Sequence, residues 1–191
     1  MSTLIEQRKS AITKGELYFW TATIHNWKHL LAADELKMQI IQSLQWLKQK
    51  ELISIYAYVI MPNHLHFIWQ IHHYNGKESP QGSLLKFTAH QFRKMLLNNQ
   101  PDVLKQYEVD AANKKHEFWQ RDSLAQLLYS KAFILQKMDY IHNNAVNGKW
   151  QLSTSADTYR FSSSAYYRTG VDEFGILTHI SEVLLLSHSG A

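Results

Sequence analysis

The stretch MPNHLHFIW, residues 61–69, follows an apolar run at 52–60 and places two histidines inside an otherwise apolar segment. Its Pro-Asn pair interrupts the run, which indicates a tight turn between two antiparallel strands. Because side chains alternate faces along a strand, His64 and His66 project from one face, whereas the side chains next to them in sequence project from the other. We therefore predict a β-hairpin that presents two neighbouring imidazoles on one side of its pleat.

Further strands and helices are predicted on either side of this hairpin. Aromatic and β-branched residues at 17–24 indicate a first strand, and apolar residues at helical spacing indicate a helix from Asp34 to about residue 50. A second helix is expected with Ser83 as its N-cap, a short edge strand at 116–120, and a third helix from Ser130 to Asn147. The order β-α-β-β-α-β is typical of a ferredoxin-like (RRM-like) α+β fold, an antiparallel sheet with helices on one face, here followed by a C-terminal helical extension.

The length and composition of the chain are those of one globular domain. Its 191 residues are 45% hydrophobic and 13% aromatic, which excludes a disordered or fibrous protein. We expect a single domain over residues 1–191, with a core at about 15–150 and an extension at 151–191.

The sequence also bears on location and partners. No apolar run approaches the ~20 residues of a transmembrane helix, the N-terminus lacks the apolar segment of a signal peptide, and there is no cysteine. We expect a cytoplasmic protein with no membrane partner. A net charge of +4 permits a polyanionic partner.

The histidine pair and the third predicted helix could together carry chemistry. Two imidazoles on one strand can reach a single divalent ion. On the helix, Gln136, Tyr140 and Asn144 share a mostly polar face at i, i+4 spacing, away from the apolar stripe. With a basic second helix, these are the parts for a metal-assisted attack on a phosphodiester, in which the tyrosine supplies the nucleophilic oxygen.

Each of these residues also has a structural interpretation. The two histidines could be half-buried side chains that hydrogen bonds satisfy, and Tyr140 could be an ordinary surface tyrosine. Asn144 could serve as a helix C-cap, and the neighbouring Asn143 could be the ligand in its place.

The motifs resemble those of a known family. YVIMPNHLHFIWQ resembles the HUH signature (His, hydrophobic, His) of single-tyrosine transposases, and QKMDYIHNNAVNGKW resembles their tyrosine-helix signature. FWQRDS and YRFSSSAYY follow in the order expected of the REP-associated branch, so the resemblance covers nearly the whole chain. One departure is Ala145, where the family usually has proline.

The resemblance implies an activity and a set of site residues. His64, His66 and Asn144 would hold Mg²⁺ or Mn²⁺, and Tyr140 would attack a DNA phosphate, leaving a 5′-phosphotyrosine link and a free 3′-OH that permit strand transfer. The expected partner is single-stranded DNA beside a hairpin, at the nucleoid of a prokaryote. Both a monomer and a homodimer that exchanges helices stay open.

Five basic residues are predicted to contact the DNA backbone, although each could be an ordinary solvated charge: Lys86, Arg93, Lys94, Arg121 and Lys137. Two other functions are also open. One is a catalytically inactive, domesticated relative that acts as a DNA- or RNA-binding module. The other is a metal-dependent nuclease that uses water and forms no protein–DNA adduct.

Overall fold

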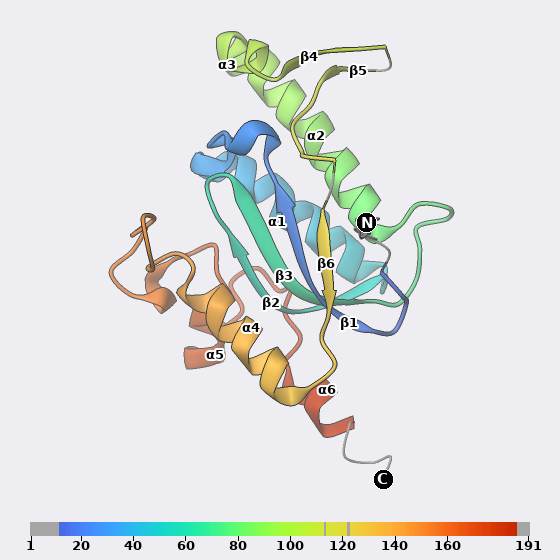
Figure 1. Cartoon of the computed structure of the whole chain (residues 1–191), viewed down its shortest axis with the longest axis vertical. Coiled ribbons are helices and arrows are strands. Elements are labelled where there is room, and N and C mark those ends of the chain that lie inside the picture. Colours follow the sequence, from blue (N-terminus) through green and yellow to red (C-terminus); the bar gives the residue numbers. More distant parts are fainter. Residues whose placement is uncertain (1–11, 113, 122, 187–191) are drawn as a thin grey trace, which may run out of the picture.

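A four-stranded antiparallel sheet forms the centre of the protein in a computed structural model that describes residues 12–112, 114–121 and 123–186 (Figure 1). Its strands lie in the order β2-β3-β1-β6. They are β1 (Leu17–Thr23), β2 (Ile53–Ile60), β3 (His64–Ile71) and β6 (Leu124–Leu127). This strand order and the β-α-β-β-α-β sequence of the main elements confirm the predicted ferredoxin-like α+β fold.

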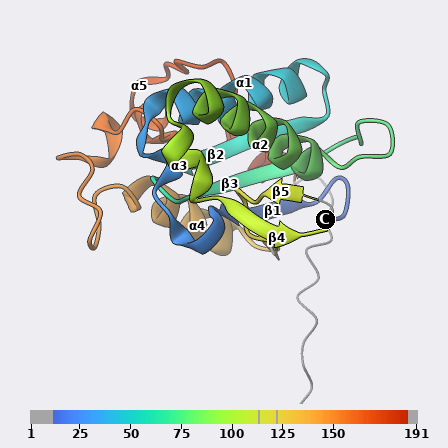
Figure 2. The same ribbon diagram turned by 90° about the horizontal axis from the view of Figure 1, so that it is seen from above.

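Helices cover both faces of the sheet, whereas the sequence analysis expected them on one face. The long helices α1 (Asp34–Gln49) and α2 (Pro80–Asn99) pack together on one face, and α4 (Lys131–Asn143) crosses the other (Figure 2). The smaller elements are η1 (His25–Trp27), η2 (Leu30–Ala32), α3 (Pro101–Lys105), the hairpin β4 (Glu108–Ala111) and β5 (Lys114–His116), η3 (Ala156–Thr158), α5 (Ser164–Thr169) and α6 (Ser181–Leu186). None of the described helices is long and apolar enough to cross a membrane.

The alternation of side chains along β3 divides the core from the polar face. Phe67 and Trp69 are fully buried, and both contact the ring of Trp20 on β1, with centroids 5.7 and 4.8 Å apart. His64 and His66 are buried on the opposite face, where His66 contacts Tyr140 of α4. One strand therefore contributes both to the apolar core and to a polar cluster.

The fourth strand is not where the sequence analysis placed it. Of the predicted edge strand at 116–120, His116 ends the short strand β5, which pairs with β4, and Trp119 forms an isolated bridge with Ile24. The strand that pairs with β1 on this side of the central sheet is β6. Trp119 instead packs against α2, where its ring lies 5.9 Å from that of Phe92 and its Nε1 donates to Thr88 Oγ1 at 3.0 Å. The aromatic residues at 116–120 are thus buried, as their type suggested, but they do not form the predicted edge strand of the central sheet.

Two predicted helix ends also shift. α2 begins three residues before the predicted N-cap, because Ser79, not Ser83, accepts a hydrogen bond from the backbone N–H of Gly82. The third helix was predicted from Ser130 to Asn147; in the structure Ser130 is the N-cap of α4, and the helix ends at Asn143.

The C-terminal extension protects the exposed edge of the sheet. β2 is an edge strand, and residues 159–178 supply partners for its backbone: Ile60 N–H donates to Phe161 O at 2.9 Å, and Thr178 N–H donates to Ile55 O at 2.8 Å. Tyr167 adds a hydrogen bond from its hydroxyl to Tyr56 O at 2.7 Å. Because an uncovered edge strand can pair with other chains, this segment protects β2 by occupying its free backbone groups.

Candidate active site

The two histidines of β3 lie side by side, and a neighbouring residue holds each ring. Their centroids are 4.8 Å apart. The Nδ1 of His64 is 2.6 Å from Asn63 Oδ1, and the Nδ1 of His66 is 2.7 Å from Thr21 Oγ1 on β1. Both hydrogen bonds engage Nδ1, so Nε2 is the nitrogen left for another partner on each ring.

The tautomer of His64 follows from the orientation of the Asn63 amide. Asn63 Nδ2 donates to the carbonyl oxygen of Trp27 at 3.1 Å, which directs Oδ1 toward His64. An amide oxygen only accepts hydrogen bonds, so His64 Nδ1 carries the proton and Nε2 carries a lone pair. This arrangement, an imidazole fixed through one nitrogen and free at the other, is how proteins orient histidine ligands of metals.

Burial keeps both imidazoles neutral. It lowers the pKa of His64 to about 4, an effect that the Asn144 side chain opposes and the charge of Lys149 reinforces. Burial likewise lowers the pKa of His66 to about 3, with further contributions from His64 and the charge of Lys137. Near neutral pH both rings are therefore in the form that binds a metal ion.

α4 places Tyr140 next to this pair. The helix buries Ile134, Met138 and Ile141, whereas Tyr140 is 48% exposed. Its hydroxyl oxygen is 3.4 Å from His66 Nε2, at the long end of the hydrogen-bonding range. The phenol therefore meets the second imidazole at the nitrogen that Thr21 leaves free.

Asn144 follows α4 and carries a buried oxygen without a partner. It is the C-cap residue of the helix, yet its backbone is right-handed helical and its Oδ1 is buried and accepts no hydrogen bond of normal geometry. The amide is close enough to His64 to influence its pKa. Asn143, in contrast, is engaged within the helix, where its Nδ2 donates to Asp139 Oδ1 at 2.8 Å.

These donors fit a divalent cation that takes both nitrogen and oxygen ligands. A buried carbonyl oxygen without a partner costs about 1–3 kcal/mol, and a cation would satisfy it. Among the described residues, no group of three or more His, Cys, Asp or Glu side chains could hold a metal, so a site here depends on the Asn144 amide. All three donors are neutral, which leaves the charge of a bound ion to be balanced by an anionic ligand.

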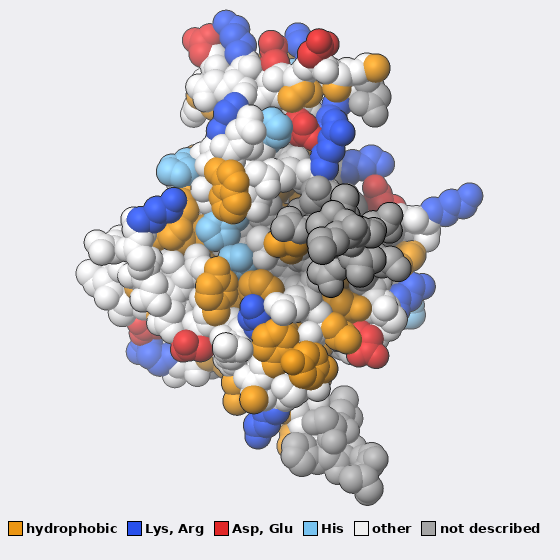
Figure 3. All heavy atoms as spheres, viewed as in Figure 1, with side chains coloured by type: hydrophobic (Ala, Val, Ile, Leu, Met, Phe, Trp, Pro, Cys, Tyr) orange, Lys and Arg blue, Asp and Glu red, His pale blue; other side chains and the backbone are white. Residues whose placement is uncertain are grey.

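An open cleft of about 550 Å³ gives access to these groups. His64, Tyr140, Asn144, Lys149 and Trp150 are among its lining residues. Histidine side chains surrounded by hydrophobic ones are visible in the middle of this face of the molecule (Figure 3). Clefts of similar size elsewhere, between η2 and α3 and between α1 and α2, bring no such set of donors together.

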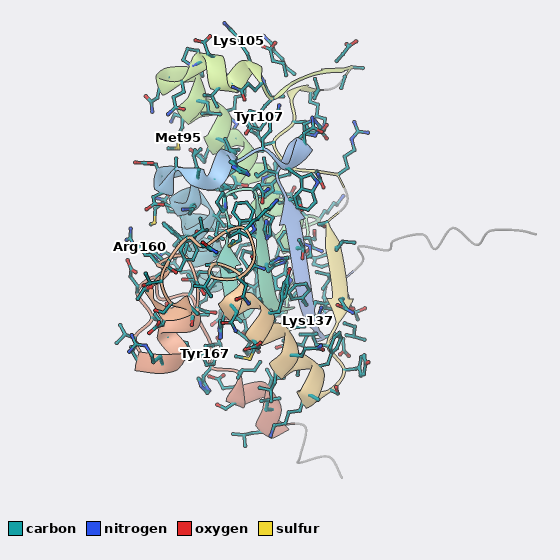
Figure 4. All side chains as sticks on the ribbon, turned by 60° about the vertical axis from the view of Figure 1, so that its left-hand side comes forward. Met95, Lys105, Tyr107, Lys137, Arg160 and Tyr167 are labelled. Carbon is teal, nitrogen blue, oxygen red and sulfur yellow. The ribbon has the colours of Figure 1, made fainter. Side chains whose placement is uncertain are left out.

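Of the five basic residues predicted to bind DNA, Lys137 lies close to Tyr140 and His66. It lies on α4 (Figure 4), and its Nζ is 4.6 Å from the ring centroid of Phe19 and 5.9 Å from that of Tyr140. Lys86, Arg93 and Lys94 are exposed on α2, across the sheet from α4. Arg121 is paired with the buried Glu117 at 3.3 Å. The three residues of α2 therefore lie away from the histidine pair, and Arg121 is engaged by a carboxylate.

Several residues at the site were not identified from the sequence: Thr21, Trp27, Asn63, Lys149 and Trp150. Asn63 directly precedes His64, so its role in orienting that ring could have been suggested from the sequence. Thr21 is 45 residues from His66, and only the pairing of β1 with β3 brings them together. The chain returns to the cleft after Gly148, which has a φ of +63° that favours glycine.

Comparisons with known proteins find similarity in solved structures alone. No family model and no curated protein matches the chain. A crystal structure of a putative transposase from Deinococcus radiodurans aligns with a TM-score of 0.42 and 17% identity, over 71% of this chain and 94% of that one. A REP-associated tyrosine transposase bound to a REP hairpin aligns with a TM-score of 0.56 and 17% identity, over 89% of this chain and 90% of that one. The second likeness shows that this chain has the fold of a tyrosine transposase over nearly its whole length.

Proposed function

We propose that the protein is a metal-dependent, single-tyrosine transposase of the HUH type that cleaves single-stranded DNA and transfers strands through a 5′-phosphotyrosine. The observation that carries the proposal is the meeting of Tyr140 with the histidine pair: its hydroxyl oxygen lies 3.4 Å from His66 Nε2, at an open cleft. The shared fold with a tyrosine transposase supports it.

The proposed ligands are His64, His66 and Asn144, which would hold Mg²⁺ or Mn²⁺. When bound, the ion supplies Lewis-acid polarisation of the phosphate that reacts. Because the three side chains are neutral, the phosphate charge of the substrate completes the electrostatic balance. Ion and DNA are therefore expected to strengthen each other's binding.

Tyr140 is the proposed nucleophile. Its oxygen forms a bond to phosphorus while the bond between phosphorus and the 3′ oxygen breaks, which leaves a 3′-OH on one fragment and a 5′-phosphotyrosine on the other. The link conserves the energy of the phosphodiester, so a 3′-OH can attack it and complete strand transfer. Exposure of the side chain leaves room for a flexible strand to approach.

Two lysines are proposed to hold the strand near the reacting phosphate. Lys137 is close enough to lower the pKa of His66, and Lys149 is close enough to lower that of His64. Together they bring positive charge to both imidazoles, where a phosphate backbone would gain from it.

The preferred substrate is proposed to be a single strand beside a hairpin, since the structure with the same fold is bound to one. The protein would then act at the nucleoid in the cytoplasm of a prokaryote, as a monomer or as a homodimer that exchanges helices.

A denaturing gel tests the function. The 5′-phosphotyrosine stays on the 3′ portion of a cut strand, so a pool of 3′-end-labelled hairpins with randomised single-stranded flanks should label the protein in Mn²⁺ and not in EDTA. Tyr140→Phe keeps the ring but removes the attacking oxygen, so labelling should disappear. His64→Ala and His66→Ala should also lose it. The control is Tyr129→Phe, which alters a tyrosine that is 80% exposed just before α4 and should label normally.

The other outcomes identify the alternatives. Cut DNA without labelled protein would indicate a nuclease that uses water. Binding without cleavage in any metal would indicate a non-catalytic DNA- or RNA-binding module. An adduct that survives in Tyr140→Phe would refute the assignment of the nucleophile.

A further inference from the structure

Trp27 is a large aromatic side chain that the structure holds in solvent. The side chain is 58% exposed. The backbone beneath it is unusual, because Asn26 and Trp27 have φ values of +54° and +56°. Residues other than glycine rarely adopt this left-handed region, and two in succession are unfavourable unless the surrounding structure enforces them. Such strain often accompanies a binding role.

The surrounding structure does enforce this conformation. Trp27 N–H donates to Ile24 O at 2.9 Å, and the carbonyl oxygen of Trp27 accepts from Asn63 Nδ2 at 3.1 Å. The preceding residue, His25, donates from its N–H to Phe118 O at 2.8 Å. The backbone of the loop is thus fixed on both sides, while most of the indole surface remains exposed.

One amide couples this loop to the proposed metal site. Asn63 donates to Trp27 with its nitrogen and accepts from His64 Nδ1 with its oxygen. The position of the indole is therefore set relative to the imidazole, and the two ring centroids are 6.3 Å apart.

A second indole and positive charge extend the same surface. Trp150 lines the cleft, with its ring centroid 6.0 Å from that of His64 and 5.4 Å from that of His29. Lys149 Nζ is 5.4 Å from the Trp150 centroid. Aromatic faces and a cation thus lie beside His64, and Tyr140 lies beside His66.

We propose that Trp27 and Trp150 form a nucleobase-stacking platform, on which one base of the single strand adjacent to the reacting phosphate rests. This inference rests on the proposed function. Aromatic side chains stack on any base, and the hydrogen-bonded backbone of Trp27 needs no further ordering when it presents its indole to one. The partner is nucleic acid and not an apolar peptide, because Lys149 lies beside Trp150 in an open cleft and Lys137 lies beside Tyr140.

Fluorescence anisotropy in EDTA separates base stacking from backbone binding without any cleavage. The probes are a labelled 20-nucleotide deoxythymidine strand and a labelled strand of the same length that carries abasic sites throughout. The wild-type protein should bind the thymidine strand more tightly. Trp27→Ala should weaken binding to it on the order of tenfold while binding to the abasic strand stays unchanged. Trp27→Phe should retain an intermediate affinity.

Trp46→Ala is the matched control. This tryptophan is 41% exposed on α1, on the opposite face of the sheet, and its loss should leave both affinities unchanged. Circular dichroism of each variant establishes that the fold is retained.

Three results would overturn the platform: a wild-type protein that does not distinguish the two strands, a Trp27→Ala variant that binds thymidine normally, and an equal loss on both strands. The adduct gel distinguishes this failure from failure of the proposed function. An adduct with no base-dependent loss in Trp27→Ala refutes the platform alone, whereas a base-dependent loss without an adduct refutes the transposase activity alone.

Discussion

Helices α1 and α2 cover one face of the sheet, and α4 crosses the other (Figure 2). On one side of β3, Phe67 and Trp69 are sealed in the core, whereas on the other His64 and His66 lie on the side of α4 beside an open cleft. Side chains alternate between the two faces along one strand, so the same rigid backbone carries both sets of residues. Their difference lies in what covers them: two long helices seal the first face, and a single helix crosses the second. The sheet thus serves as core on one side and as a platform for polar groups on the other.

Unpaired polar atoms sharpen this contrast. Among the residues that the structure describes, the indole N–H groups of Trp20 and Trp69 find no hydrogen-bond partner on the sealed face, and Asn144 Oδ1 finds none on the open face. A donor closed inside an apolar core has no access to a ligand, so its cost is permanent. The oxygen of Asn144 lies in a residue that lines the cleft, where a bound cation can satisfy it.

The largest expected effect on stability comes from a substitution in the core on the sealed face. Phe67→Ala should lower the free energy of unfolding by about 3–5 kcal/mol, because it opens a cavity in a fully buried ring cluster. His66→Ala should cost less, about 1–2 kcal/mol, because water from the cleft can fill the space, yet it should abolish adduct formation. Urea unfolding followed by circular dichroism measures both. Equal losses in the two variants would show that the histidine face also carries core packing.

The sealed face was also the more predictable from sequence. Periodicity reports which residues are buried, so the hairpin of β2 and β3 and the central part of each long helix were predicted correctly. β6 escaped prediction because Leu124 and Leu127 are exposed; the strand exists through pairing with β1. Aromatic residues at 116–120 gave a stronger strand signal, but their burial is against α2.

The open face could be predicted only in part, for a different physical reason. The residue types His64, His66 and Tyr140 suggested chemistry, and strand alternation and helical spacing placed them on defined faces. The groups that orient them come from distant segments: Thr21 through strand register, and Trp27 through the Asn63 amide. Hydrogen bonds between distant segments produce no periodic pattern in the sequence, so they could not be predicted from it.

Low pH is expected to have an intermediate effect on the stability of the fold. Burial holds the pKa of His64 at about 4 and of His66 at about 3, below the usual value of about 6.5 for an exposed histidine. Between these values the unfolded chain binds protons that the folded chain does not, so stability is full above about pH 6.5 and falls as the pH drops toward 4 and 3. Each imidazole should contribute on the order of 1–2 kcal/mol to the loss between pH 7 and pH 5.

Unfolding in urea at pH 7 and pH 5, in EDTA, measures this response. His64→Asn removes one buried imidazole and should reduce the pH-dependent loss. His73→Asn, on an exposed loop, is the control and should leave it unchanged. An undiminished loss in His64→Asn would locate the acid sensitivity elsewhere, with His142 as the next residue to test, because burial lowers its pKa to about 4 as well.

The smallest effect on stability, and the most specific to the open face, is expected at Asn144. Asn144→Ala removes the unfavourable buried oxygen together with some of the packing of the side chain, and these two changes should largely cancel. The free energy of unfolding should therefore change by no more than about 0.5 kcal/mol. If the oxygen is a metal ligand, the same variant should need more Mn²⁺ to form the adduct, and high Mn²⁺ should restore part of the activity. Asn144→Asp replaces a neutral oxygen by a charged one and should bind Mn²⁺ more tightly.

Asn143→Ala is the matched control, because that side chain is bonded to Asp139 within α4. Mn²⁺ titrations of adduct yield and of the melting temperature report the two properties separately. A lower melting temperature in Asn144→Ala with unchanged Mn²⁺ dependence would make this residue a helix cap, and the ion would then need a third ligand from elsewhere in the cleft.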